Sequence, residues 1–370
     1  MDKLQIGIHY SIIYFLIVFL SVIFCAFTEM GRKQKKIYLF CVMSVFFIIM
    51  AFRSSHMGND TQNYIAIFNK VSVATSPIGF AEATAIEKGY ILYNSILSKI
   101  FGANARWLFV ITAVLICHSL GRYIDKYSNT PGIVCCLFVP MSLSFFMAGL
   151  RQAIAVAIFL YSYDFIENKK FIKFLLLSIL ALQFHNSAII FLALYFMMNY
   201  KSDASKWFNT FLMVVTVVCF CFFDKFLILI LRIFPKYVYY VGGVMMDGEP
   251  RLAIFLQVIV SIMLLFVPKI LEKHEIESVK KQSNNEKLSK INVALLIISS
   301  NATALNRMSA YFTIFALNQY SNDFSKLKSQ NKTILLVLTV IAFYLYGLII
   351  AIYKTPDWET TYPLLLQWEM

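Results

Sequence analysis

The sequence is poor in charged residues. Only 14% of its 370 residues are Asp, Glu, Lys or Arg and 59% are hydrophobic, whereas a soluble domain is about 25% charged and about half apolar. No polar stretch is long enough to form a soluble domain, and many apolar runs approach the roughly 20 residues that a membrane-spanning helix needs. We therefore expect an all-α polytopic integral membrane protein in which residues 1–370 form a single transmembrane domain.

Signatures of metal and nucleotide chemistry are also missing. None of the seven cysteines has a CxxC partner or a histidine at ligand spacing, and there is no DxD pair. We therefore predict no metal site and no cofactor. The cysteines lie inside apolar runs, where a thiol acts as a small hydrophobic group: Cys25, Cys41, Cys117, Cys135, Cys136, Cys219 and Cys221.

The basic residues predict membrane topology. The formal net charge of +13 would suit a nucleic-acid-binding protein, but the basic residues are scattered among short loops, so we expect no nucleic-acid partner. In membrane proteins, loops rich in Lys and Arg stay in the cytoplasm. Glu29–Lys36 carries four basic residues and is predicted to be cytoplasmic, which places the N-terminus and a loop at 53–106 outside. The same rule predicts a cytoplasmic loop at 268–290 and a second outer loop at 224–250.

We split two apolar stretches, the first because one crossing there would place the lysine-rich loop 268–290 outside. Phe171–Asn199 is then a hairpin with His185 at its outer turn, and not one tilted crossing. Ile291–Leu317 is then a pair of short helices broken near 301–307. With the other apolar runs, these splits give about twelve helices. The arms of the split stretches are short for a full bilayer, so the set consists of transmembrane or re-entrant helices.

Residues 89–101, inside the first outer loop, predict an amphipathic helix. One half of its helical wheel is apolar: Leu92, Tyr93, Ile96, Leu97, Ile100 and Phe101. Apart from Ile91, the other half is polar: Asn94, Ser95, Ser98 and Lys99. A helix of this kind lies in the membrane interface, so we expect it on the outer leaflet.

Four polar features share the outer side in this topology. They are Arg53 with the following "HMGNDTQNY", Arg151–Gln152, His185 and Arg307. Three guanidinium groups near the membrane need anionic partners, because an unpaired charge in hydrocarbon is costly. Guanidinium forks match phosphate oxygens bidentately, so the cluster predicts a cationic pocket for a lipid-linked phosphate or pyrophosphate.

Simpler interpretations of single residues stay open. Arg53 alone also fits a side chain that extends from a helix end toward water. His185 alone also fits a hydrogen-bonded, partly buried imidazole. Among the acids of the outer side, Asp60 is in the same segment as Arg53 and can pair with one arginine at most.

An ordered series of motifs resembles the EpsG family, which is grouped with the Wzy-like polymerases of O-antigen and exopolysaccharide. The series begins with "RSSHMGNDTQNY" and "EKGYILYNSILSKIFG" and continues with "GLRQAIAVAIFLYSYDFI", "ALQFHNSAIIFLAL" and "NRMSAYF". It extends from about Phe52 to Leu317. The resemblance implies an architecture like that of GT-C polymerases and ligases, in the bacterial inner membrane, with the active site facing the periplasm.

The resemblance also implies a reaction. Undecaprenyl-pyrophosphate-linked oligosaccharide serves as donor and acceptor, and the growing glycan moves onto the non-reducing end of another repeat unit. By analogy, the catalytic residues are Arg151, His185, Arg307 and Asp60. The residues expected to bind substrate are Arg53, Gly58, Thr61, Tyr64, Gln152, Tyr311, Asp247 and Glu249.

Several functional alternatives remain open at this stage. The proton acceptor is one of four residues: His185, Asp60, Asp247 or Glu249. An O-antigen ligase would use the same donor, and a flippase would transport the same lipid-linked oligosaccharide. Membrane lipid is an expected partner of the helices. The sequence leaves open whether a chain-length regulator protein also docks against them.

Overall fold

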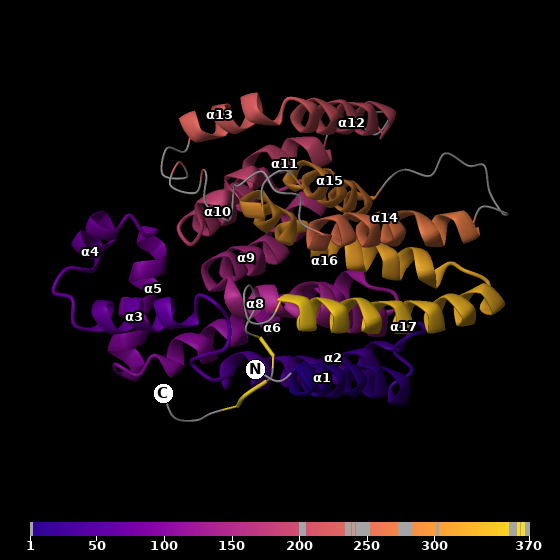
Figure 1. The fold of residues 1–370 in the computed structure, drawn as a ribbon, viewed down its shortest axis with the longest axis horizontal. Helices are drawn as coiled ribbons and strands as arrows, with labels where there is room; N and C mark the ends of the chain where they lie inside the picture. The colour runs from indigo at the N-terminus through magenta and orange to yellow at the C-terminus, as the bar shows by residue number, and fades with distance from the viewer. Residues whose placement is uncertain are drawn as a thin grey trace. The chain divides into compact units, whose positions relative to one another are not determined.

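The computed structural model describes residues 3–199, 205–233, 238, 241, 252–272, 283–300, 303–354, 361–362 and 364–366. Within these ranges the chain forms helices and isolated bridges, without a strand. The predicted all-α class is therefore confirmed. The chain divides into two compact units, Met1–Tyr195 with Lys332–Met370 and Phe196–Asn331, which are described separately (Figure 1).

The long helices of the first unit are apolar and pack side by side. Helix α2 packs on α1 and on α6, and α6 also packs on α9. These helices are α1 (Lys3–Ile23), α2 (Arg32–Ala51), α6 (Arg106–Tyr127) and α9 (Leu150–Glu167). Most of α17 (Ser329–Lys354) also belongs to this unit.

A further apolar segment leads to Arg151. It consists of α7 (Pro131–Phe138), a π-helical turn (Val139–Leu143) and α8 (Ser144–Ala148). Pro140 lies in the π-helical turn, as expected because proline cannot donate to the preceding turn of an α-helix. The segment ends at Gly149, and α9 starts directly after it.

Three shorter helices lie between α2 and α6: α3 (Thr61–Ser72), α4 (Pro77–Thr84) and α5 (Lys88–Phe101). Ser76 caps α4 by accepting a hydrogen bond from the Gly79 amide, and Pro77 occupies the first helical position. Figure 1 shows the three helices together beyond the ends of α1 and α2. Their apolar side chains form one buried cluster that includes Tyr64, Phe68 and Tyr90.

Helix α5 confirms the predicted helix at 89–101, and its exposure is unusual. Asn94 and Ser95 are buried, while the apolar Leu92, Ile96 and Ile100 are 52%, 46% and 65% exposed. The polar side of this helix therefore packs against the protein and an apolar stripe faces outward. This arrangement is what contact with lipid requires, and the location on the outer leaflet stays a prediction.

The predicted hairpin at Phe171–Asn199 is present. Helix α10 (Phe171–Leu182) ends before the polar residues Gln183–His185, and a 3₁₀ turn, η2 (Asn186–Ile189), leads into α11 (Ile190–Asn199). The Tyr195 ring lies 5.0 Å from the Phe171 ring, so α11 runs back alongside α10.

The second unit contains α12 (Ser205–Cys221), α13 (Phe223–Ile233), α14 (Leu252–Glu272), α15 (Asn284–Ser299) and α16 (Thr303–Ser325). Helices α14, α15 and α16 pack on one another, and α12 packs on α15. The chain breaks between α15 and α16 earlier than predicted, so Arg307 lies within α16. Helix α13 occupies the start of the predicted outer loop 224–250.

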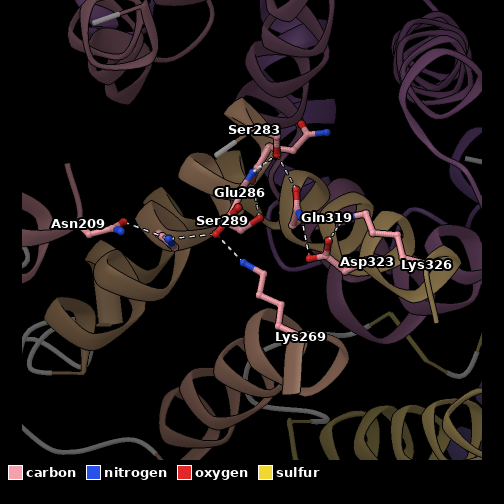
Figure 2. A network of polar contacts seen from close by, with 10 residues as sticks. Asn209, Lys269, Ser283, Glu286, Ser289, Gln319, Asp323 and Lys326 are labelled. Carbon is pink, nitrogen blue, oxygen red and sulfur yellow. Dashed lines mark hydrogen bonds and ion pairs between the residues drawn. The ribbon is translucent and has the colours of Figure 1, made fainter. Parts of the chain in front are cut away.

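A polar network joins the helices of the second unit, as Figure 2 shows. Glu286 accepts hydrogen bonds from Lys269 at 2.5 Å and forms an ion pair with Lys290 at 3.1 Å. Lys290 also donates to Asn209 of α12 at 3.0 Å. Because these residues come from α12, α14 and α15, the network fixes three helices against one another.

Six described helices are long and apolar enough to cross a membrane, and the bent pair α12–α13 would make seven. They are Lys3–Ile23, Arg32–Ala51, Arg106–Tyr127, Pro131–Ala148, Ala253–Glu272 and Ser329–Tyr353. The chain is therefore a multi-pass membrane protein, while the count of about twelve is not confirmed. Helices α10 and α11 are too short for a full crossing.

Candidate functional site

Arg151 forms an ion pair with Glu87 in the first unit. The Arg151 Nη1 atom donates to Glu87 Oε2 at 2.5 Å. The other carboxylate oxygen, Oε1, accepts from the Asn186 side-chain amide at 2.8 Å and from its backbone amide at 3.3 Å. Glu87 therefore joins the starts of three elements, α5, α9 and η2. We call Glu87, Arg151 and Asn186 together the Glu87 junction.

Burial differs between the two ionised side chains. The Glu87 side chain is 7% exposed, whereas that of Arg151 is 31% exposed. The Tyr90 ring lies 5.9 Å from the Arg151 guanidinium carbon, and burial raises the pKa of this phenol. One edge of Arg151 is thus fixed by the protein, and the exposed part of its side chain can reach a ligand.

A close backbone approach places Glu87 near Asn186. The Tyr90 amide donates to the Gln183 carbonyl oxygen at 3.1 Å, across the gap between α5 and the end of α10. A Cβ atom on Gly89 would lie 2.4 Å from Gln183 Cβ and 2.8 Å from the Gln183 oxygen. Gly89 is therefore needed for the approach of the two backbones, and not for a turn.

Arg53 is buried at the end of α2, with only 2% of its surface exposed. Its guanidinium donates to the carbonyl oxygens of Met50 at 2.9 Å and Met147 at 2.8 Å, and lies 4.6 Å from the Phe109 ring centre. Within the described residues no carboxylate forms an ion pair with it. Burial lowers the pKa of this guanidinium, which still stays charged at neutral pH. Arg53 thereby holds the end of α8, four residues before Arg151.

The polar segment after Arg53 packs against the same turn. Gly58 has φ +88°, and a Cβ atom there would lie 3.3 Å from the Met147 carbonyl oxygen. The Thr61 hydroxyl donates to the Met57 carbonyl oxygen at 2.5 Å. Asp60 stands half-buried before α3 and makes no capping hydrogen bond with its side chain. The segment positions the turn that carries Arg151.

The chain near the C-terminus also contacts this segment. Arg53 pairs with Leu366 in an isolated antiparallel bridge, and the Ser54 amide donates to the Leu365 carbonyl oxygen at 2.8 Å. The Arg106 Nη1 atom donates to the Arg53 carbonyl oxygen at 2.8 Å. Contacts from two distant parts of the sequence thus fix the backbone at Arg53.

His185 adjoins the Glu87 junction through the chain. It is half-buried and caps η2, and its Nδ1 atom accepts from the Ser187 amide at 3.3 Å. Because Nδ1 accepts, a neutral His185 carries its proton on Nε2. To act as a base through Nδ1, the imidazole would have to lose this contact with Ser187.

The remaining sequence-predicted residues are distributed over both units. Tyr64 is buried with its ring 6.0 Å from the Tyr90 ring, and Gln152 is buried next to Arg151. Arg307 is exposed and Tyr311 is buried, both on α16 of the second unit. Asp247 and Glu249 lie outside the described residues. A common site for all three arginines therefore stays a prediction.

Sequence reasoning missed the residues that bind Arg151. It did not single out Glu87, Tyr90 or Asn186 as partners of Arg151. The available signal was the resemblance itself, because Glu87 is the only acid in "EKGYILYNSILSKIFG". In the described part of the chain, no group of three His, Cys, Asp or Glu side chains is placed to hold a metal ion.

The fold and this site define a multi-pass helical membrane protein with a charged junction at the ends of its helices. The chain belongs to the EpsG family, whose profile matches residues 36–366. This is a family of Wzy-like polymerases, so membership indicates a polysaccharide polymerase of the glycosyltransferase type. No curated protein and no solved structure matches the chain.

Proposed function

We propose that the protein polymerises lipid-linked repeat units of an O-antigen or exopolysaccharide. The growing glycan moves from one undecaprenyl-pyrophosphate carrier to the non-reducing end of a repeat unit on another carrier. The reaction takes place on the periplasmic face of the bacterial inner membrane. The observation that carries this proposal is Arg151, a part-exposed guanidinium held by Glu87 at a helix start, in a member of a polymerase family.

Diphosphate chemistry suits such an arginine. The acceptor hydroxyl oxygen attacks the anomeric carbon of the donor, and the bond from this carbon to the pyrophosphate oxygen breaks. The carrier pyrophosphate leaves with the bonding electrons, and the hydroxyl proton passes to a base. A fixed guanidinium stabilises the charge that develops on the leaving group without having to reorganise during the reaction.

The proton acceptor in this proposal is one of four residues: His185, Asp60, Asp247 or Glu249. Glu87 is less suited, because a carboxylate bound to arginine and to two amide donors is a weak base. Arg307 as a catalytic residue and Tyr311 as a substrate-binding residue remain proposals from the sequence resemblance. Gly58 and Thr61 support the site by positioning the turn before Arg151.

Deleting the gene in its own host tests the proposal. We expect single repeat units to persist and long chains to disappear from a gel of surface polysaccharide. Loss of even the single repeat would instead indicate a ligase, and unchanged long chains would refute the proposal. Elongation of lipid-linked oligosaccharide by the purified protein, without nucleotide sugar or ATP, separates a polymerase from a flippase.

Arg151 variants test the residue that carries the argument. Arg151→Ala should abolish chain growth, and Arg151→Lys should restore little of it, because lysine lacks the bidentate fork. Normal chain lengths in Arg151→Ala would remove this residue from the site.

A further inference from the structure

A hollow of about 350 Å³ adjoins the Glu87 junction. Its walls come from the end of α4, the first residues of α5 and the break between α10 and η2. The size falls in the range of about 300–1,000 Å³ that is typical of small-molecule sites. The family likeness and the sequence motifs assign no role to this hollow.

The polar lining of the hollow differs from that of an anion site. It contains two carboxylates and one ammonium group, from Glu82, Glu87 and Lys88, with the amides of Gln183 and Asn186. Its ammonium group, Lys88, is already paired with the Glu82 carboxylate, so the lining disfavours a phosphate or pyrophosphate. Carboxylate and amide groups together supply acceptors and donors, which a polyhydroxylated ligand can satisfy.

The lining is also partly apolar, with Ala81, Ala85, Ile86 and Leu182 between the polar groups. Sugar rings present C–H faces as well as hydroxyl edges, so a mixed wall of this kind suits a saccharide better than a free ion. The Lys88–Glu82 ion pair at 2.7 Å, which also lines the hollow, is exposed.

Glu87 connects the hollow to Arg151. Its carboxylate lines the hollow and binds the Arg151 guanidinium through Oε2 at 2.5 Å. A ligand in the hollow and a diphosphate on Arg151 would therefore be separated by a single side chain. In a glycosyl transfer the acceptor sugar and the leaving group must lie this close, on either side of the anomeric carbon.

We propose that this hollow is the acceptor subsite, which binds the non-reducing-end sugar of the incoming repeat unit. The proposal rests on the polymerase function and adds the position of the acceptor. The Gln183 and Asn186 amides and the Glu82 and Glu87 carboxylates orient the sugar hydroxyl groups. Arg151 and the hollow thus bind chemically different parts of the two substrates.

An acceptor that cannot donate tests the proposal. An alkyl glycoside of the repeat unit keeps the acceptor hydroxyl but lacks the pyrophosphate leaving group, so it can only be elongated. Purified protein is given lipid-linked donor and this glycoside, and KM is measured for each. Gln183→Trp and Glu82→Trp fill the hollow from two different elements, the end of α10 and α4; both side chains are exposed, so neither change disturbs the core.

We expect KM for the glycoside to rise about tenfold or more in both filling variants, with KM for the donor nearly unchanged. Matched controls place the same bulky side chain on exposed neighbours that do not line the hollow. These are Ile189→Trp, matched to Gln183, and Ala83→Trp, matched to Glu82; both should leave KM for the glycoside unchanged.

The outcomes separate the subsite from the function. If the wild-type protein does not elongate lipid-linked repeats, the polymerase function itself fails. If it does, but the filling variants leave KM for the glycoside unchanged or raise both KM values equally, the hollow is not the acceptor subsite. A wild-type protein that elongates lipid-linked repeats but refuses the glycoside also overturns the proposal, because recognition would then depend on the lipid or the diphosphate.

Discussion

Replacing Glu87 by glutamine tests the junction around Arg151 most directly. The carboxylate accepts from Arg151 on one oxygen and from Asn186 on the other. A glutamine amide has only one oxygen, so one of the two donors would face an NH₂ group and lose its partner. Because the Glu87 side chain is only 7% exposed, water can replace the lost bond only in part.

The size of the effect follows from this burial. Breaking a fully buried ion pair costs about 3–5 kcal/mol. Arg151 is 31% exposed, so we expect a smaller loss, of about 1–3 kcal/mol, in the free energy of unfolding. Arg151→Met should cost a similar amount. The double variant leaves neither charge behind, so its cost should be below the sum of the single costs by about 1–2 kcal/mol.

Unfolding of the purified protein by SDS in mixed micelles, followed by helical circular dichroism, measures this cycle. Glu82→Gln is the matched control, because the same chemical change falls on an exposed residue of the adjacent helix and should leave the midpoint unchanged. Additive costs for Glu87→Gln and Arg151→Met, within about 0.5 kcal/mol, would refute the ion pair as a structural link.

Three further predictions concern the surroundings of the junction. Gly89→Ala should destabilise the protein by about 1–3 kcal/mol in the same titration, because the new Cβ would overlap Gln183; a neutral result would contradict the close backbone approach. Arg53→Lys should lower the free energy of unfolding by about 1–3 kcal/mol, since one ammonium group cannot reproduce the planar fork that reaches two carbonyl oxygens and the Phe109 ring. In a background without native cysteines, His56→Cys should react with a membrane-impermeant maleimide from outside the cell, and His185→Cys should react more slowly because it is half-buried; labelling only from the cytoplasm would reverse the topology.

The helical elements followed from local sequence. Apolar runs and their polar interruptions located α2, α5 and the break at Gln183–His185, because a helix that loses its apolar character in mid-membrane has to end or turn. The break after α15 was placed too late, since α16 already starts at Thr303. The number of spans could not be settled in this way, because apolarity alone does not say which short helices re-enter and which cross.

The residues around Arg151 could not be derived from local sequence. The Glu87 carboxylate lies close to Asn186 because Gly89 lets α5 contact Gln183, which lies 94 positions further along the chain than Gly89. The hydrophobic periodicity of the sequence does not predict a contact between residues so far apart in the chain. For α5, the helical wheel predicted the apolar half that carries Ile96, whereas the burial of Asn94 on the polar half depends on the neighbouring elements.

The structure also changes how the arginines of the outer side are interpreted. The sequence placed Arg53 among the substrate-binding residues and Arg151 among the catalytic ones, both on the outer side. Arg53, however, is 2% exposed and donates to two backbone carbonyls, so it has little surface left for a substrate.

The charge balance around Arg151 still favours an anionic ligand. The carbonyl contacts of Arg53 do not cancel the charge of its guanidinium, whereas the Glu87 carboxylate opposes the charge of Arg151. Two guanidinium groups near one turn thus face one ion-paired carboxylate, and the field still favours an anion at the exposed part of Arg151. The carboxylate-rich hollow on the other side of Glu87 favours a ligand without phosphate. A diphosphate would then bind on one side of the Glu87 side chain and a sugar on the other, as a transfer between two carriers requires.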